Sequence, residues 1–168
     1  MMVKSMMESK ETIQISRMNT SFGILQILAD THFVYGVRWV NLHDELEDGI
    51  MPGDPAPANQ MREELERYFS GDLMEFTTPL LLVGSPFQVS VWEMLRKIPF
   101  GETRSYAEMA HAIGNPLAFR AVALANRANR FAIVIPCHRV IYSSGKAGGY
   151  RGGIEKKEWL LQHERRKK

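Results

Sequence analysis

The stretch SPFQVSVWEMLRKIPFGETRSYAEMAHAIGNP, residues 85–116, decides the fold of the C-terminal half of this 168-residue chain, because it holds two complete helix-start signals. Ser85 is a natural N-cap, and Gln88 follows three residues later, as in a capping box. Ser105 and Glu108 repeat the same spacing further along the chain. Each predicted helix also has a glycine where it should stop, Gly101 and Gly114. The stretch therefore predicts two successive helices.

A third predicted helix follows directly in NPLAFRAVALANRAN, residues 115–129. Asn115 is expected to cap it, with Pro116 at the first helical position. Two helices joined by a Gly-Asn-Pro turn are a candidate helix-turn-helix, although most helix pairs of this kind are simple packing units. The third helix is rich in alanine and carries one long cation, Arg120, near its start. This slim profile suits close approach to a partner, and it equally reflects the high helix propensity of alanine.

Charge is distributed unevenly along the chain. From residue 85 onward there are 15 Lys and Arg against 6 Asp and Glu, a balance of +9, whereas residues 1–84 have 6 against 13, a balance of −7. The net charge of +2 therefore conceals a basic C-terminal half. Such asymmetry is typical of a surface for nucleic acid or another polyanion, and solvated surface lysines and arginines are the alternative.

The N-terminal part is predicted to be a small sheet followed by a helix. Runs of β-branched, aliphatic and aromatic residues predict three strands, in residues 12–19, 22–30 and 32–40. Residues 41–59 are polar and contain prolines and glycines, which predicts a loop, and residues 61–69 have helical spacing with Gly71 as a stop. We expect an N-terminal α/β domain over residues 1–83, without chemistry of its own, and a C-terminal domain over residues 84–168.

The composition excludes several classes of protein. With 45% apolar residues, the chain is long enough to bury a hydrophobic core. No run approaches the roughly 18 apolar residues of a membrane span, and the N-terminal stretch lacks the apolar region of a signal peptide. The cytoplasm or nucleoid is therefore the expected location. The single cysteine cannot form an internal disulfide, and no His/Cys spacing indicates a metal site.

That single cysteine, Cys137, lies in IVIPCHRV, residues 133–140. The segment FAIVI, residues 131–135, is predicted to be a buried strand that ends at Pro136, which places the thiol where the chain leaves the core. A free thiol needs a stabilising group to act as a nucleophile at neutral pH. His138 is the obvious helper, but adjacent side chains of an extended chain point in opposite directions, so contact through a water or a bend is expected. A small core cysteine with a structural histidine is the alternative.

The motif PCHRV, residues 136–140, resembles the signature of the O6-alkylguanine-DNA alkyltransferases, also called methylated-DNA-protein-cysteine methyltransferases. The stretch 85–116, RAVALANRAN and GGYRGGIEKKEWLLQHE match the same family in order and spacing, so the resemblance covers residues 85–164. FGILQILADTHFVYGVRW is similar to its looser N-terminal domain. The resemblance implies an α/β fold of two small domains: a ribonuclease H-like N-terminal α/β domain and a mainly helical C-terminal domain with a winged helix-turn-helix.

The resemblance also implies a DNA repair activity and its catalytic residues. Cys137 would take the alkyl group from O6 of guanine in an SN2 displacement, and the resulting thioether would leave the protein inactive after one turnover. His138 would act as the base through a bridging water, and Glu164 would orient it. Asn129 would brace the turn before the active site. Tyr106 would help to extrude the base and would donate to the departing guanine.

The same resemblance implies how the chain would bind double-stranded DNA containing O6-alkylguanine. The helix-turn-helix would lie in the minor groove, and Arg120 would fill the gap left by the extruded nucleotide. Tyr150 would form a wall of the guanine pocket, and the carbonyl of Val140 would accept from the guanine amine. The expected DNA contacts are Arg120, Tyr106, Ala121, Ala123 and Arg127. Arg151 departs from the family, because some members have serine there, and it would add a phosphate contact, with a surface arginine as the alternative. The implied pocket residues are Val140, Tyr150, Arg151 and Phe131.

Some features depart from the family or bear on other classes. Asn129 is followed by Arg130 where many members have proline, and the N-terminal part lacks zinc-ligand cysteines, so neither a metal nor another cofactor is expected. A DNA-binding protein that senses alkyl damage without transfer is the main alternative, and Cys137 argues against it. A cysteine hydrolase would need a direct Cys-His contact, and a thiol redox regulator a second cysteine. The protein is expected to be a monomer without membrane contacts.

Overall fold

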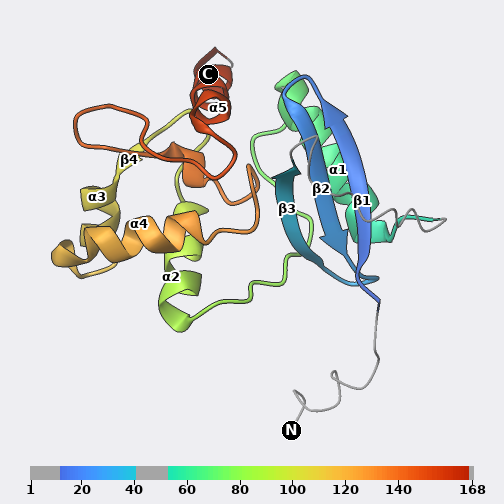
Figure 1. The fold of residues 1–168 in the computed structure, drawn as a ribbon, viewed down its shortest axis with the longest axis horizontal. Coiled ribbons are helices and arrows are strands. Elements are labelled where there is room, and N and C mark those ends of the chain that lie inside the picture. Colours follow the sequence, from blue (N-terminus) through green and yellow to red (C-terminus); the bar gives the residue numbers. More distant parts are fainter. Residues whose placement is uncertain (1–11, 41–52, 167–168) are drawn as a thin grey trace, which may run out of the picture.

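The computed structural model describes residues 12–40 and 53–166 and places a sheet beside a group of helices (Figure 1). The sheet with α1 is called here the sheet half, and the later elements form the helical half. In chain order the elements are β1 Gln14–Thr20, β2 Gly23–Ala29, β3 Val34–Val40, α1 Ala56–Ser70, α2 Pro86–Leu95, β4 Arg104–Ser105, α3 Tyr106–Ala112, η1 Pro116–Ala118, α4 Phe119–Arg127, η2 Cys137–Arg139, β5 Val140–Ile141 and α5 Ile154–Arg166. The predicted α/β class, with a small sheet followed by helices, is confirmed.

The sheet consists of antiparallel strands in the order β1-β2-β3, and these are the three segments that the sequence predicts. A polar side chain closes each turn between them. Thr20 Oγ1 accepts the N–H of Phe22 at 3.1 Å, and Asp30 Oδ1 accepts the N–H of Phe33 at 2.7 Å. Gly23 follows the first turn with a φ of 128°, a conformation that favours glycine. Local hydrogen bonds therefore reinforce the hydrophobic pattern that predicts the strands.

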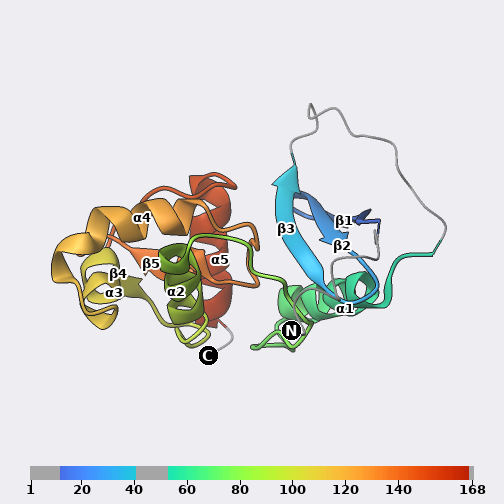
Figure 2. The same ribbon diagram turned by 90° about the horizontal axis from the view of Figure 1, so that it is seen from below.

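Helix α1 covers one face of the sheet (Figure 2). The side chains that it buries against the core include Ala58, Met61, Leu65 and Tyr68. Its predicted end is confirmed, because Gly71 has a φ of 83° and donates its N–H to the Tyr68 carbonyl. The helix begins earlier than expected, at Ala56, because Pro57 suits the first helical turn. The end of the predicted loop is therefore wrong, and residues 41–52 of that loop lie outside the described residues.

Both predicted capping boxes are present in the helical half. Ser85 Oγ accepts the N–H of Gln88 at 3.2 Å, and Gln88 Oε1 accepts the N–H of Ser85 at 2.9 Å. Ser105 and Glu108 make the same reciprocal pair, with distances of 3.1 and 2.6 Å. Each box satisfies two backbone donors that a helix start would otherwise leave unpaired. These bonds explain why α2 and α3 begin where the sequence predicts.

Two predicted helix boundaries are wrong. Helix α2 ends at Leu95 instead of near Gly101, because Pro99 cannot continue a helix and also disfavours helical backbone in the residue before it. Helix α4 starts three residues after Pro116, because η1 forms a short 3-10 turn there first. Asn115 makes no side-chain capping bond, and its backbone carbonyl instead accepts the N–H of the last residue of η1 at 2.9 Å.

The predicted helix-turn-helix is formed by α3, η1 and α4, which pack on one another and on α2 (Figure 1). The indole N–H of Trp92 in α2 donates to the backbone carbonyl of Ala125 in α4 at 2.8 Å. Glycine is required at position 84, beside the Trp92 ring, because a Cβ there would lie 2.6 Å from that ring. The short parallel strands β4 and β5 pair next to this unit.

The two halves meet along the outer edge of β3. The N–H of Val37 donates to the Arg130 carbonyl at 2.9 Å, and the Val37 carbonyl accepts the N–H of Ala132 at 2.8 Å. Along the same edge, Val34 makes a corresponding pair with Pro79 and Leu81, in the segment that leads from α1 to the helical half. One continuous cluster of buried side chains runs through both halves. The segment that leads to Cys137 is therefore anchored on the N-terminal sheet.

The prediction of a strand over residues 131–135 is wrong. Phe131 forms an isolated bridge to β3, and the chain then turns instead of extending. The N–H of Val134 donates to the Ala132 carbonyl at 2.8 Å, and Ile133 between them has a φ of 71°, which is rare for a β-branched residue. The segment is buried as expected, but as a compact turn that shortens the path to the thiol.

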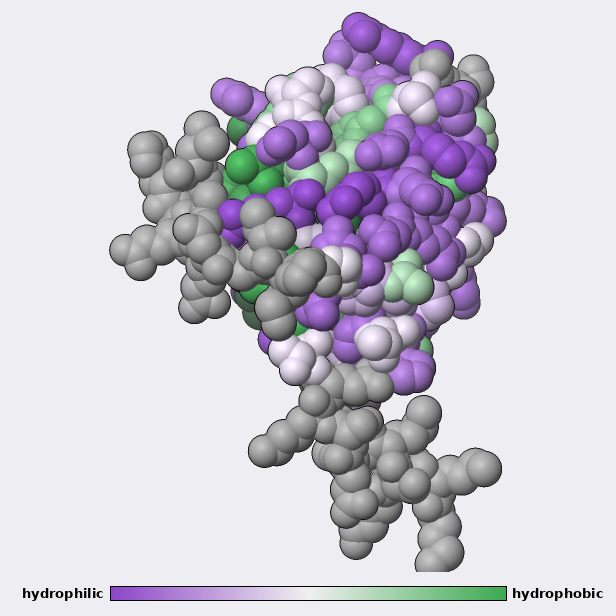
Figure 3. Space-filling view, turned by 90° about the vertical axis from the view of Figure 1, so that its right-hand side faces the viewer, coloured by the Kyte–Doolittle hydropathy of each residue, from purple (hydrophilic) through white to green (hydrophobic). Residues whose placement is uncertain are grey.

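Hydrophilic side chains cover most of the outer side of the sheet half (Figure 3). Within residues 12–40 and 53–166, no helix combines the length and apolar character needed to cross a membrane. The same residues hold no group of three or more His, Cys, Asp or Glu side chains arranged to bind a metal ion.

Candidate active site

Cys137 is the first residue of η2 and is buried, with 7% of its surface exposed. The strained turn before it and the side chain of Asn126 hold its backbone, since Asn126 Nδ2 donates to the Cys137 carbonyl at 3.2 Å. Burial raises the pKa of the Cys137 thiol, with partial opposition from Asn129 and from the positive charge of Lys157. The thiol is therefore protonated in the free protein, and a base must remove its proton before it can act as a nucleophile.

His138 is completely buried and pairs with Glu164 of α5, with 2.7 Å between Nε2 and Oε1. Burial lowers the pKa of His138, and the nearby carboxylate opposes this effect without overcoming it. The imidazole is therefore neutral at neutral pH and carries its proton on Nε2, where it donates to the carboxylate. Nδ1 of His138 has no hydrogen-bond partner within the described part of the chain. It is a free acceptor one residue from the thiol.

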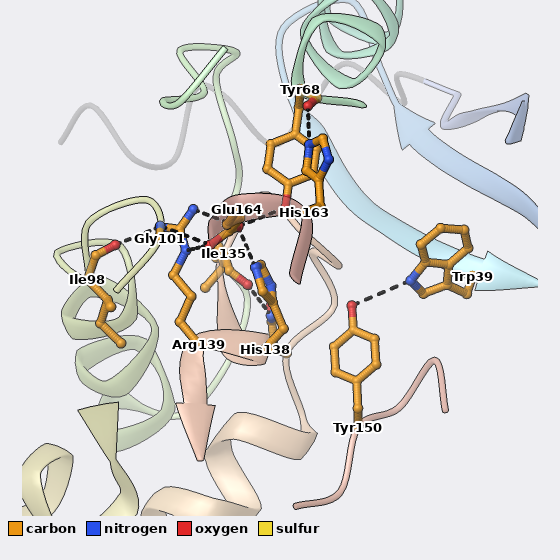
Figure 4. A network of polar contacts seen from close by, with 11 residues as sticks. Trp39, Tyr68, Ile98, Gly101, Ile135, His138, Arg139, Tyr150, His163 and Glu164 are labelled. Carbon is orange, nitrogen blue, oxygen red and sulfur yellow. Dashed lines mark hydrogen bonds and ion pairs between the residues drawn. The ribbon is translucent and has the colours of Figure 1, made fainter. Parts of the chain in front are cut away.

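Glu164 is the centre of a buried polar network (Figure 4). Its carboxylate accepts five hydrogen bonds, from Tyr68, Gly101, His138 and twice from Arg139, at 2.7 to 3.2 Å. Burial alone would raise the pKa of Glu164, but the bonds from His138 and Arg139 outweigh it and hold the pKa well below its usual range. A permanently charged and fully bonded carboxylate fixes the orientation and tautomer of His138.

Asn129 holds together the turn that precedes the thiol. Its Nδ2 donates to the Ile135 carbonyl at 2.8 Å, and its Oδ1 accepts the N–H of Phe131 at 2.9 Å. These bonds span the turn that contains Ile133, whose positive φ needs support from its surroundings. Asn129 therefore bonds the backbone on both sides of Ile133.

Replacing Asn129 by alanine is expected to destabilise the protein by about 1–3 kcal/mol for each buried backbone group left without a partner. Denaturant unfolding at constant m-value measures the loss. Asn115→Ala is the matched control, because Asn115 is exposed and makes no capping bond. Equal stability of the two variants would contradict the bracing role.

Most of the side chains expected to contact DNA lie on or beside the helix-turn-helix. Arg120, Ala121 and Arg127 are exposed on α4, and Ala123 is partly exposed. Tyr106 is half-buried at the start of α3, and its ring lies 5.5 Å from that of Tyr142. The sequence reasoning missed two apolar side chains of the same surface, Leu117 and Leu124, which are 87% and 67% exposed.

The residues expected to form a pocket fall into two groups. Tyr150 is half-buried and Arg151 is exposed, both in the loop before α5. Burial raises the pKa of the Tyr150 hydroxyl, and the next largest cause is its interaction with Cys137. Phe131 and Val140 are 1% and 0% exposed, so their side chains belong to the core, and a ligand could reach their backbone only.

Four buried polar residues at the site were not predicted as site residues: Tyr68, Asn126, Arg139 and Lys157. Lys157 lies two helical turns before Glu164 on the buried side of α5, and its ammonium donates to the carbonyls of Val140 and Gly149 at 2.7 and 3.2 Å. Burial lowers the pKa of Lys157 to about 8. One sequence signal could have indicated Lys157: a lysine and a glutamate spaced i, i+7 lie on the same face of the helix as Leu160 and Leu161. Tyr68 comes from the sheet half and had no such signal.

Acid should destabilise the protein before its carboxylates titrate. The pKa of His138 is lowered in the folded state, so between its unfolded value of 6.5 and its folded value the unfolded chain binds more protons. The free energy of unfolding is therefore expected to decline as the pH falls below 6.5, and Glu164, whose pKa is also lowered, adds to the loss below 4.5. Urea titrations at a series of pH values measure this. A constant free energy between pH 6.5 and 4.5 would contradict a neutral, buried His138.

The fold and the site together define an α/β protein that places a buried thiol, a histidine and a carboxylate beside a helix-turn-helix. The family model described as the DNA-binding domain of 6-O-methylguanine DNA methyltransferase matches residues 86–166. A methylated-DNA–protein-cysteine methyltransferase from Mycobacterium bovis is 52% identical over 112 residues, which are 67% of this chain and 68% of the relative. The chain belongs to the family of methylated-DNA–protein-cysteine methyltransferases.

Another relative of that name, from Mycolicibacterium paratuberculosis, is 58% identical over 104 residues, and the match spans 62% of this chain and 63% of the relative. Among solved structures, the M. tuberculosis OGT in complex with DNA is 40% identical, with a TM-score of 0.82. That comparison covers 92% of this chain and 94% of the other. The similarity to the solved structure therefore extends over both halves of the fold.

Proposed function

We propose that this chain repairs DNA by transferring an alkyl group from O6 of guanine to its own Cys137. The observation that carries the proposal is the buried thiol one residue before a neutral histidine, whose Nε2 bonds a charged carboxylate and whose Nδ1 is a free acceptor. Family membership supports the same activity. A structural role for the cysteine would not require the charged, fully bonded network around Glu164, because a small buried hydrophobe needs no base beside it.

The proposed chemistry balances as a single displacement. His138 Nδ1 takes the thiol proton through a bridging water, and the charge that develops on the imidazole is stabilised by Glu164. The sulfur then bonds to the alkyl carbon while the bond from that carbon to O6 breaks. The electron pair of that bond leaves with the guanine, and Tyr106 donates a hydrogen bond to it. A thioether has no good leaving group, so each molecule acts once. Burial of the thiol requires the target base to leave the duplex first.

We propose that double-stranded DNA containing O6-alkylguanine is the partner, bound through the minor groove by α3 and α4. The slim surface of the exposed Ala121 and the partly exposed Ala123 suits a narrow groove, and Arg127 and Arg151 supply cations for phosphates. Arg120 would enter the base stack at the place of the extruded nucleotide. Tyr150 and Arg151 would line the pocket with their side chains, while Val140 and Phe131 would contribute through backbone or through support from the core.

We further propose a domain boundary between residues 83 and 84 and action as a monomer in the cytoplasm or nucleoid. No metal or other cofactor takes part in the proposed reaction, because the thiol, the base and the carboxylate supply all of its steps.

Arg120→Ala is expected to slow transfer from duplex DNA at least about tenfold, because Arg120 would offset part of the few kcal/mol needed to unstack the base. Transfer from the free base O6-methylguanine should stay unchanged, since it requires no extrusion. Single-turnover rates with both substrates measure the difference. Arg96→Ala is the control, since Arg96 lies just after α2 and pairs with Glu93. Equal losses on both substrates would contradict the proposed role.

The proposed activity is tested on the DNA. Wild type and Cys137→Ser are mixed with a duplex that contains one O6-methylguanine, and the restored guanine is quantified after digestion. Wild type should restore guanine in an amount equal to the protein and no more, while Cys137→Ser restores none. Binding of the damaged duplex without restoration by the wild type would overturn the proposal in favour of a damage sensor.

A further inference from the structure

Trp39, at the end of β3, reaches across from the sheet half to the loop that carries Tyr150. Its indole nitrogen lies 3.4 Å from the Tyr150 hydroxyl, and Figure 4 shows the two groups pointing toward each other. The indole also lies against Gly152, where a Cβ would come within 2.5 Å of Trp39 Cδ1 and 2.8 Å of Tyr150 Cε1. Trp39, Tyr150 and Gly152 therefore form one tight contact between the two halves.

Contacts from outside the loop support the position of Tyr150. Five of the nine residues from 145 to 153 are glycine, so the segment has few side chains and much backbone freedom. Lys157 anchors its backbone at the Gly149 carbonyl. Trp39 contacts the side chain of Tyr150 itself, and the ammonium of Lys156, a residue of α5, lies 5.3 Å from the centre of the indole ring. The indole therefore braces Tyr150 from outside the loop.

We propose that Trp39 is a specificity-determining residue, which braces the Tyr150 wall beside Cys137 and thereby limits the size of the alkyl group that the site accepts. This inference rests on the proposed function, because it concerns the space into which the alkyl group must fit. The Lys157 ammonium bonds both the Gly149 carbonyl, next to Tyr150, and the Val140 carbonyl, directly after the η2 turn that begins at Cys137, so the loop of Tyr150 lies beside the turn that carries the thiol. A large alkyl group displaces Tyr150 less easily when the Trp39 ring supports it than when only the glycine-rich loop holds it.

The test compares O6-benzylguanine with O6-methylguanine in the same duplex, so that DNA binding and base extrusion cancel in the ratio of the two transfer rates. Trp39→Ala is expected to raise the benzyl-to-methyl ratio about tenfold, the scale on which pockets discriminate apolar groups. Trp159→Ala is the control, because its ring packs on Phe22, Phe69 and His163 elsewhere between the halves. Its ratio should equal that of the wild type.

If Trp39→Ala does not fold, as a thermal melt would reveal, Trp39→Met retains an unbranched apolar side chain and should change the ratio in the same direction. An unchanged ratio in a folded Trp39 variant that still transfers methyl groups would overturn this inference alone. Failure of the wild-type protein to transfer a methyl group would overturn the proposed function, and this inference with it.

Discussion

Replacing His138 by alanine is expected to slow transfer to Cys137 about 10²- to 10⁴-fold, the usual contribution of a general base. Burial raises the pKa of the thiol, so the free protein holds little thiolate at neutral pH. The neutral His138, with Nε2 on Glu164 and Nδ1 free, is the acceptor that the geometry provides for the thiol proton. Single-turnover rates on a duplex with one O6-methylguanine measure the loss.

A base also makes a specific pH signature. The variant should regain rate as the pH rises toward the pKa of the thiol, whereas the wild-type rate should change less over the same range. His32→Ala serves as the control, because His32 is exposed in the turn between β2 and β3. A His138→Ala rate within about twofold of the wild type, well short of the loss of a general base, would show that another group activates Cys137.

Glu164→Gln is expected to destabilise the protein by about 3–5 kcal/mol, because it leaves the buried charge of Arg139 without its partner. Arg139 is 5% exposed and donates two of its hydrogen bonds to this carboxylate. The NH₂ group of the glutamine amide would also face groups that now donate hydrogen bonds to the carboxylate, so these donors would lose an acceptor. Denaturant unfolding gives the free energy, and an unchanged m-value in the same titration indicates that the surface exposed on unfolding is unchanged.

The matched control is Glu93→Gln, since Glu93 forms an exposed ion pair with Arg96 at 3.6 Å on the surface of α2. An exposed pair of this kind contributes about 0–1 kcal/mol. If Glu164→Gln and Glu93→Gln lose the same free energy of unfolding, the buried network does not stabilise the fold as its geometry indicates.

The starts of α2 and α3 could be predicted from the sequence because their causes are local. Ser85 with Gln88, and Ser105 with Glu108, satisfy backbone donors within one turn, so their spacing alone carries the information. The prediction that Asn115 caps the next helix was wrong, because a 3-10 turn begins at Pro116 and precedes the helix. The same local residues permitted two geometries there, and packing of the helix-turn-helix selected one.

The apolar segment 131–135 shows a limit of pattern alone. A short apolar run between turn signals fits a buried strand and a buried turn equally well. What decides between them is Asn129, whose side chain bonds the backbone on both sides of Ile133, together with the edge of β3, which pairs with Arg130 and Ala132. These contacts lie far apart in the sequence or depend on a side chain outside the run.

Sequence motifs indicated some residues of the candidate site, whereas residues brought there only by tertiary packing were missed. Cys137 and His138 stand side by side in PCHRV, and Glu164 follows from the resemblance. Tyr68 joins them only because α1 packs against α5, where His163 Nε2 also lies 2.8 Å from the Tyr68 carbonyl. Neither segment contains a sequence pattern that predicts a contact between α1 and α5.

The central claim is that Cys137 itself receives the alkyl group, and the mass of the intact protein tests it most directly. Wild type and Cys137→Ala are each mixed with an excess of duplex containing one O6-methylguanine. The wild-type protein should gain the mass of a single methyl group in place of the thiol proton, however long it is incubated, and peptide mapping should place it on Cys137. Cys137→Ala should gain nothing. An unchanged wild-type mass, or a methyl group on the alanine variant, would contradict the account.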